Sequence, residues 1–120
     1  MRFARYVFAA AGIWGLLVLI PLYFAEPDGL TRPEFYYGFI GIALAFQFVF
    51  FLIATDPARY RKIMAVAVIE KLAFAVPAVV LYLQGRLSPD MLAAGLIDLF
   101  LGVLFVISYV KTPAELEGSL

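Results

Sequence analysis

Three ionisable side chains interrupt the apolar stretches of this sequence and are the residues best suited to chemistry. Glu70 and Lys71 are adjacent in one stretch, Asp98 lies in the next, and Gln47 is a strongly polar side chain at similar depth in an earlier one. Such a charge costs about 2.5 to 3.5 kcal/mol near the centre of a membrane helix, so it usually faces other helices and marks a functional site. We therefore expect Glu70, Lys71, Asp98 and Gln47 to form a ligand or proton site.

The depths of these residues can be compared through the helical rise of about 1.5 Å per residue. Counted from the polar residues that flank each stretch, Glu70, Lys71 and Gln47 lie about 12 to 13.5 Å deep and Asp98 about 19.5 Å deep. Glu70 and Gln47 are therefore expected to meet. A direct bond between Lys71 and Asp98 is at the limit of reach.

The helical neighbours of the charges add two features. Gly95 and Gly102 flank Asp98 at helical spacing, which allows a close helix contact either inside this chain or between two copies. Pro77 lacks an N–H, so the carbonyl of Ala73 is expected to be a further acceptor beside the charges.

A purely structural role for the same residues stays open. Lys71 can extend toward the membrane surface, Glu70 can bond to Gln47, and Asp98 can act as a neutral hydrogen-bonding group at a helix contact. In that case the polar residues hold helices together and bind nothing.

The composition excludes most other chemistries. The 120 residues contain no Cys and no His, which excludes a thiolate nucleophile, a disulfide, a zinc site of the usual ligands and a haem ligated by His or Cys. Nine basic residues balance nine acidic ones, so the concentrated positive charge of a nucleic-acid binder is missing. We expect no catalytic residue, no metal, no cofactor and no nucleic acid, and the sequence leans against an enzymatic role without excluding one.

Four long apolar stretches must position these residues. Apolar residues make up 65% of the chain, and the stretches 6–25, 35–55, 63–85 and 91–110 each match the roughly 20 residues needed to cross a membrane. We predict an all-α integral membrane four-helix bundle that forms a single transmembrane domain over residues 1–120. The expected helices cover about 5–25, 34–55, 58–85 and 89–111, followed by a short C-terminal tail, 112–120.

Capping residues support these helix starts. Thr31 and Glu34 have the spacing of a capping box, and Asp56–Pro57 and Ser88–Pro89 each place a capping side chain before a proline. The connections are short, so sequential helices are expected to be antiparallel neighbours in an up-down bundle.

Basic residues are unequally divided between the two expected sides of the membrane, six against two. By the positive-inside rule the richer side is cytoplasmic, which places both termini in the cytoplasm of a multi-pass protein. The richer side holds Arg2, Arg5, Arg59, Arg61, Lys62 and Lys111, and the other holds Arg32 and Arg86.

Several stretches together resemble a family of small, uncharacterised four-helix proteins of the bacterial inner membrane. The likeness covers most of the chain and implies a fold and a location, but no activity. The small multidrug-resistance transporters have a similar length, but they need a glutamate in the first helix, where this chain has no acid. The stretches that carry the likeness are 12–15, 21–24, 35–41, 56–61, Glu70–Lys71, 95–98 and 102–105.

Three functions remain open. The first is a non-enzymatic membrane component, either an accessory subunit or a binder of a lipid-like or quinone-like molecule. The second is a proton-linked transporter or channel, in which Glu70 or Asp98 exchanges a proton while Lys71 compensates charge. The third is an acid–base enzyme that uses both acids on an apolar substrate. The expected partners are the lipid bilayer and a second copy or a larger membrane complex.

Overall fold

The structure of the chain, a computed structural model, describes residues 2–113. They form four helices, α1 (Arg2–Tyr23), α2 (Pro33–Thr55), α3 (Arg61–Leu83) and α4 (Pro89–Lys111), and no strand occurs within this range. Each helix is long and apolar enough to cross a membrane. The predicted all-α class and the four membrane-length helices are confirmed. Most of the predicted tail, from position 114 onward, lies outside the described residues.

Two of the helices start at a proline, as expected. Pro33 and Pro89 occupy the first turns of α2 and α4, where a missing N–H leaves no helical hydrogen bond unmade. The capping box predicted for α2 is wrong, because Arg32 takes the N-cap position. The carboxylate of Glu34 accepts a hydrogen bond from the Arg32 side chain at 2.9 Å instead of turning back to cap the helix.

The helix α3 begins at Arg61 rather than at position 58, because the chain first makes a separate turn over residues 56–60. The Asp56 carbonyl accepts the N–H of Tyr60 at 3.1 Å, and the Asp56 carboxylate accepts the N–H of Arg59 at 3.4 Å. Asp56 therefore closes the turn and does not cap α3. At its other end α3 stops before Gly85, whose φ of 71° is a left-handed conformation that suits glycine.

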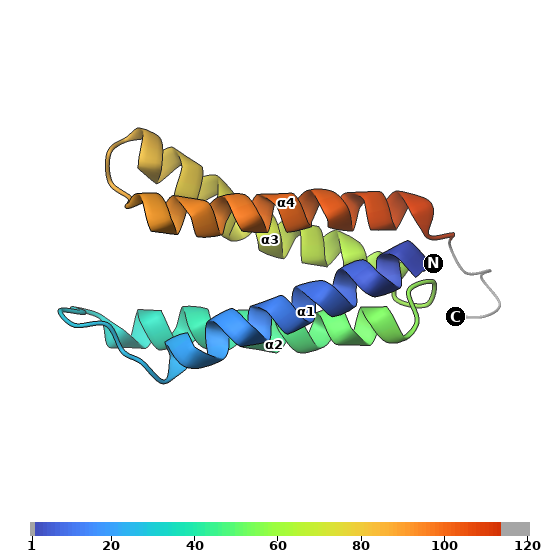
Figure 1. Cartoon of the computed structure of the whole chain (residues 1–120), viewed down its shortest axis with the longest axis horizontal. Helices are drawn as coiled ribbons and strands as arrows, with labels where there is room; N and C mark the ends of the chain where they lie inside the picture. Colours follow the sequence, from blue (N-terminus) through green and yellow to red (C-terminus); the bar gives the residue numbers. More distant parts are fainter. Residues whose placement is uncertain (1, 114–120) are drawn as a thin grey trace.

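The helices pack in two pairs, α1 with α2 and α3 with α4 (Figure 1). Each pair is in close contact at glycine. A Cβ atom on Gly15 of α1 would overlap the side chain of Gln47 on α2, and a Cβ on Gly95 of α4 would stand 2.6 Å from the Cβ of Ala78 on α3. The absence of a side chain at these positions lets the paired helices approach each other.

An aromatic core joins the two pairs. Phe8 of α1 stacks on Phe105 of α4 with 4.2 Å between ring centroids, and Phe50 of α2 meets Phe105 edge-on at 5.0 Å. All three rings are fully buried, and Met64 and Ala67 complete the core from α3. In Figure 1 the pairs converge at the end that holds the N-terminus and the α2–α3 connection, which we call the N-terminal end. They diverge toward the other two connections, at the distal end.

Arg61 fastens the start of α3 to the end of α4. Its Nε donates to the carbonyls of Tyr109 at 3.2 Å and Thr112 at 2.8 Å, and its guanidinium carbon lies 3.8 Å from the centroid of the Tyr109 ring. The last carbonyls of a helix lack intrahelical donors and carry partial negative charge, so a cation is favourable here. This contact shows which residues of α3 and α4 lie at the same level.

Large apolar side chains cover the outside of all four helices. Leu17, Ile42, Ile69 and Phe100, one from each helix, are all more than half exposed. A water-soluble monomer rarely exposes such a continuous apolar surface. The outside of the molecule is therefore suited to contact with lipid chains.

Candidate functional site

Lys71 is the centre of a charged cluster formed by α3 and α4. Its Nζ lies 3.4 Å from Oδ1 of Asp98 and 3.7 Å from Oε2 of Glu70. The Lys71 side chain is 6% exposed, compared with 16% for Glu70 and 24% for Asp98. The structure thus brings together the three ionisable residues expected to cluster. The direct bond between Lys71 and Asp98 is formed, although the depths estimated from the sequence put it at the limit of reach.

The register of α3 against α4 explains why this bond can form. Lys71 lies ten residues beyond Arg61, about 15 Å along α3, and Asp98 lies eleven residues before Tyr109, about 16.5 Å along α4. Because Arg61 is bonded to the Tyr109 carbonyl, Lys71 and Asp98 lie at nearly the same level along the two helices. Lys62 and Lys111 are not level, so depths counted from them put Asp98 too deep relative to Lys71.

Phe50 and Gly102 complete the surroundings of Lys71. The Nζ atom lies 5.1 Å from the centroid of the Phe50 ring, within the range of a cation–π interaction. A Cβ on Gly102 would stand 3.3 Å from the Cβ of Lys71, so glycine lets the lysine stem lie against α4. Sequence reasoning does not single out Phe50. No sequence signal singles it out, because other phenylalanines surround it in α2, at positions 46, 48 and 51.

The small residues around Asp98 are used inside the chain. Gly95 and Gly102 are both buried, Gly95 against Ala78 and Gly102 against Lys71. Of the two alternatives for these glycines, the contact inside the chain is formed, because α3 occupies their face. A contact between two copies stays a prediction.

Gln47 does not join the charged cluster. It is 1% exposed, and its Nε2 donates to the Ala43 carbonyl one turn earlier, at 2.7 Å. Its side chain lies against Gly15 of α1, and its Oε1 has no hydrogen-bond donor among residues 2–113. The expected contact with Glu70 is absent within that range. The reason is the helix face, because Gln47 shares the side of α2 that packs on α1.

The Ala73 carbonyl is also not an acceptor for the cluster in the described part of the chain. Ala73 and Pro77 both lie on the exposed side of α3, whereas Lys71 lies on the buried side. The proline does remove a hydrogen bond from that carbonyl, but the carbonyl is on the wrong side of the helix to meet the charges.

Both carboxylates lie on the sides of α3 and α4 that face the α1–α2 pair. Glu70 is one turn before Phe74, whose ring centroid is 5.7 Å from that of Phe39 on α2. Asp98 is two turns before Phe105, which belongs to the aromatic core. Residues four or seven apart share a helix face. The cluster therefore lies between the two helix pairs, at the distal border of the aromatic core.

The cluster has unused capacity to accept hydrogen bonds. Two carboxylates surround one ammonium, which leaves a formal charge of minus one when all three are ionised. Oε2 of Glu70 is buried and receives no hydrogen bond from residues 2–113. Its distance of 3.7 Å from the Lys71 Nζ is longer than a hydrogen bond. The arrangement can therefore bind a proton or a group that donates a hydrogen bond.

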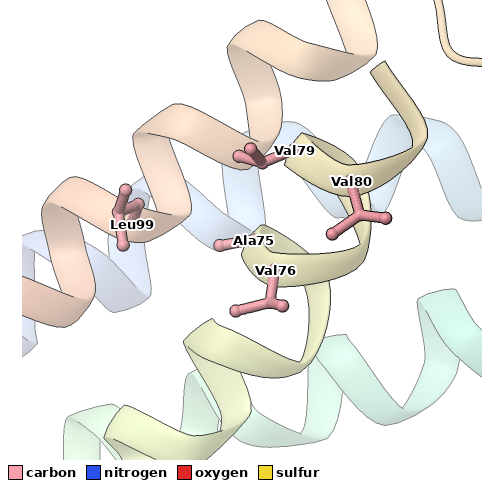
Figure 2. A pocket seen from close by; sticks show the side chains of 5 residues that line it. All are labelled: Ala75, Val76, Val79, Val80 and Leu99. Carbon is pink, nitrogen blue, oxygen red and sulfur yellow. The ribbon is translucent and has the colours of Figure 1, made fainter. Parts of the chain in front are cut away.

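An apolar hollow of about 220 Å³ lies between α3 and α4 (Figure 2). It is lined by Ala75, Val76, Val79, Val80 and Leu99. Figure 2 shows Ala75 and Val79 pointing toward α4. Val79 is nine residues, about two and a half turns, from Glu70, so the hollow and that carboxylate are on opposite sides of the helix. The hollow can contact an apolar chain but does not include the charged groups.

Neither a known protein family, nor a curated protein, nor a solved structure matches this chain. Within the described residues, no three acidic side chains come together in a way that could hold a metal ion. What the site can do therefore follows from its own geometry, a buried lysine with two partly exposed carboxylates between two helix pairs.

Proposed function

We propose that this protein is a small multi-pass protein of the bacterial inner membrane, built as an antiparallel up-down bundle with both termini in the cytoplasm. The four membrane-length helices and the alternation of their connections between the two ends support this arrangement. The excess of basic residues at the N-terminal end supports the orientation.

In that membrane we propose that it binds a lipid-like or quinone-like molecule, alone or as an accessory subunit of a larger complex, and catalyses no reaction. The position of the charged cluster carries this proposal. Glu70 and Asp98 remain partly exposed between the two helix pairs, and the outer surfaces of the helices are apolar. A molecule with a polar head and an apolar tail matches both features, because the head can donate to the carboxylates while the tail contacts the helices.

Mass spectrometry of molecules that stay with the purified protein tests this function. We expect the wild-type protein to retain a lipid or quinone, and Asp98→Asn to reduce that retention about tenfold or more, since a hydrogen bond to a charged group contributes about 1.5 to 3 kcal/mol. Arg86→Gln is the matched control, because Arg86 is exposed at the distal end. Equal retention by the wild type and both variants would contradict the proposal.

A proton-linked transporter or channel is the second candidate, and the excess of carboxylates over ammonium groups favours it. A buried carboxylate without a full partner can exchange a proton, while Lys71 keeps the charge of the site close to neutral. In this function Glu70 or Asp98 would take up and release the proton.

Purified protein in liposomes that contain a pH-sensitive dye separates the two candidates. Proton transport predicts acidification under an imposed potential that is lost in Glu70→Gln or in Asp98→Asn, whichever removes the proton-carrying group, and that is retained in Arg86→Gln. A binder predicts no acidification by any of these proteins. Acidification that survives both carboxylate substitutions would exclude the cluster as the proton site.

A further inference from the structure

Exposed cations gather at the N-terminal end of the molecule. Arg2, Arg5, Arg59, Lys62 and Lys111 are exposed, and none forms an ion pair with any residue from 2 to 113. The one acid of this end within that range is Asp56, whose carboxylate accepts the backbone N–H of Arg59.

The distal end has the opposite character. Arg32 is bonded to Glu34 at 2.9 Å, and Arg86 donates to Gln84 at 3.1 Å. Four acids also lie there, namely Glu26, Asp28, Glu34 and Asp90. Within residues 2–113 the distal end therefore holds more acids than cations, and the excess of positive charge lies at the N-terminal end.

One of the cations is held in a defined place. The Nζ of Lys111, at the end of α4, lies 4.7 Å from the centroid of the Phe3 ring on α1. Phe3, Ala10 and Trp14 follow one another at intervals of seven and four residues, so they share one side of α1. Ala10 and Trp14 are exposed on that side. A cation at the membrane surface is thus aligned with an open apolar path that runs into the membrane.

We propose that the N-terminal end binds an anionic phospholipid, with its phosphate at Lys111 and an acyl chain along Phe3, Ala10 and Trp14. Charge complementarity selects an anionic head, and the apolar side of α1 selects a lipid over a soluble anion. This proposal does not depend on the function of the Lys71 cluster, which lies on α3 and α4 and carries the opposite charge.

Quenching of the single tryptophan, Trp14, measures this binding directly. The full chain is placed in vesicles that contain phosphatidylglycerol or phosphatidylcholine, either of which can carry brominated acyl chains. We expect brominated phosphatidylglycerol to quench more strongly at equal mole fraction. Lys111→Gln should lower the relative affinity for phosphatidylglycerol about fivefold, the effect of one cation at an anionic surface. Lys111→Arg should restore it.

Controls assign the effect to this end. Arg86→Gln should leave the preference unchanged, and circular dichroism should show the same helicity for every variant. Equal quenching by the two lipids would overturn the proposal, as would a preference that Lys111→Gln does not alter. The proposal would also be overturned if the preference for phosphatidylglycerol were seen only in the double variant Glu115→Gln, Glu117→Gln. In that case acids of the C-terminal tail, and not a lipid phosphate, would neutralise the cations of this end in the wild-type protein.

Discussion

Removal of the Lys71 ammonium should leave two carboxylates between the helix pairs without a cationic partner. At 3.4 Å the attraction between Nζ and the Asp98 carboxylate is about 5 kcal/mol at an effective dielectric constant of about 20. Loss of one partner of a buried pair typically costs about 3 to 5 kcal/mol, because the other charge remains desolvated. We therefore expect Lys71→Met to lower the free energy of unfolding by about that amount.

A double-mutant cycle separates the pair from its surroundings. Lys71→Met, Asp98→Asn and the combined variant should give a coupling energy of about 2 to 3 kcal/mol. The coupling of Lys71 with Glu70 should be smaller, since their atoms are 3.7 Å apart and form no hydrogen bond. The assay is reversible unfolding of the purified protein in mixed micelles, followed by circular dichroism. Arg86→Met removes an exposed charge and should change stability by less than about 0.5 kcal/mol.

Simple addition of the single effects would refute this reasoning. It would mean that Lys71 and Asp98 act independently despite their contact. A larger coupling for Glu70 than for Asp98 would instead show that the Lys71 ammonium is directed mainly to its neighbour in sequence.

Three other results are expected. Gly95→Ala should lose about 1 to 3 kcal/mol of unfolding free energy, because its Cβ would stand 2.6 Å from a Cβ of α3, whereas Gly38→Ala, with open space around it, should gain about 0.5 to 1 kcal/mol. Arg61→Lys should lose about 1 to 2 kcal/mol in the same assay, because an ammonium cannot reproduce the planar contacts with the end of α4. Alkaline phosphatase fused after Leu120 should be inactive, and a fluorescent protein fused there should fluoresce, if that terminus is cytoplasmic.

Each of these expectations has a result that would contradict it. Equal effects of alanine at Gly95 and Gly38 would show that the α3–α4 contact is not close. Full stability of Arg61→Lys would show that charge alone holds the end of α4. Phosphatase activity after Leu120 would reverse the proposed orientation.

Much of the fold could be predicted because the signals are local. Four apolar stretches of membrane length gave the helices directly, and Pro33 and Pro89 marked two of their starts. The turn over residues 56–60 could not be predicted in the same way, because a capping side chain before a proline suits a turn as well as a helix. Asp56 closes that turn, and α3 begins only at Arg61.

The candidate site could be predicted by residue type but not by register. The cost of charge in an apolar helix was enough to single out Glu70, Lys71 and Asp98. Whether they meet depends on the register of α3 against α4, which results from contacts along the whole interface, including those of Arg61 and Gly95. Gln47 has the right depth but the wrong helix face, and depth alone contains no information on face.

The separation of the helices into two pairs bears on how the chain is synthesised and inserted. The contact of Gly15 with Gln47 lies wholly within the first pair, and the contact of Gly95 with Ala78 lies wholly within the second. Each hairpin can therefore leave the translocon with its own internal interface complete, before the other hairpin is needed. A gene split within codons 56–60 should then yield two fragments that insert separately and reassociate through the Phe8, Phe50 and Phe105 rings, so the protein is in effect a dimer of hairpins joined by a tether.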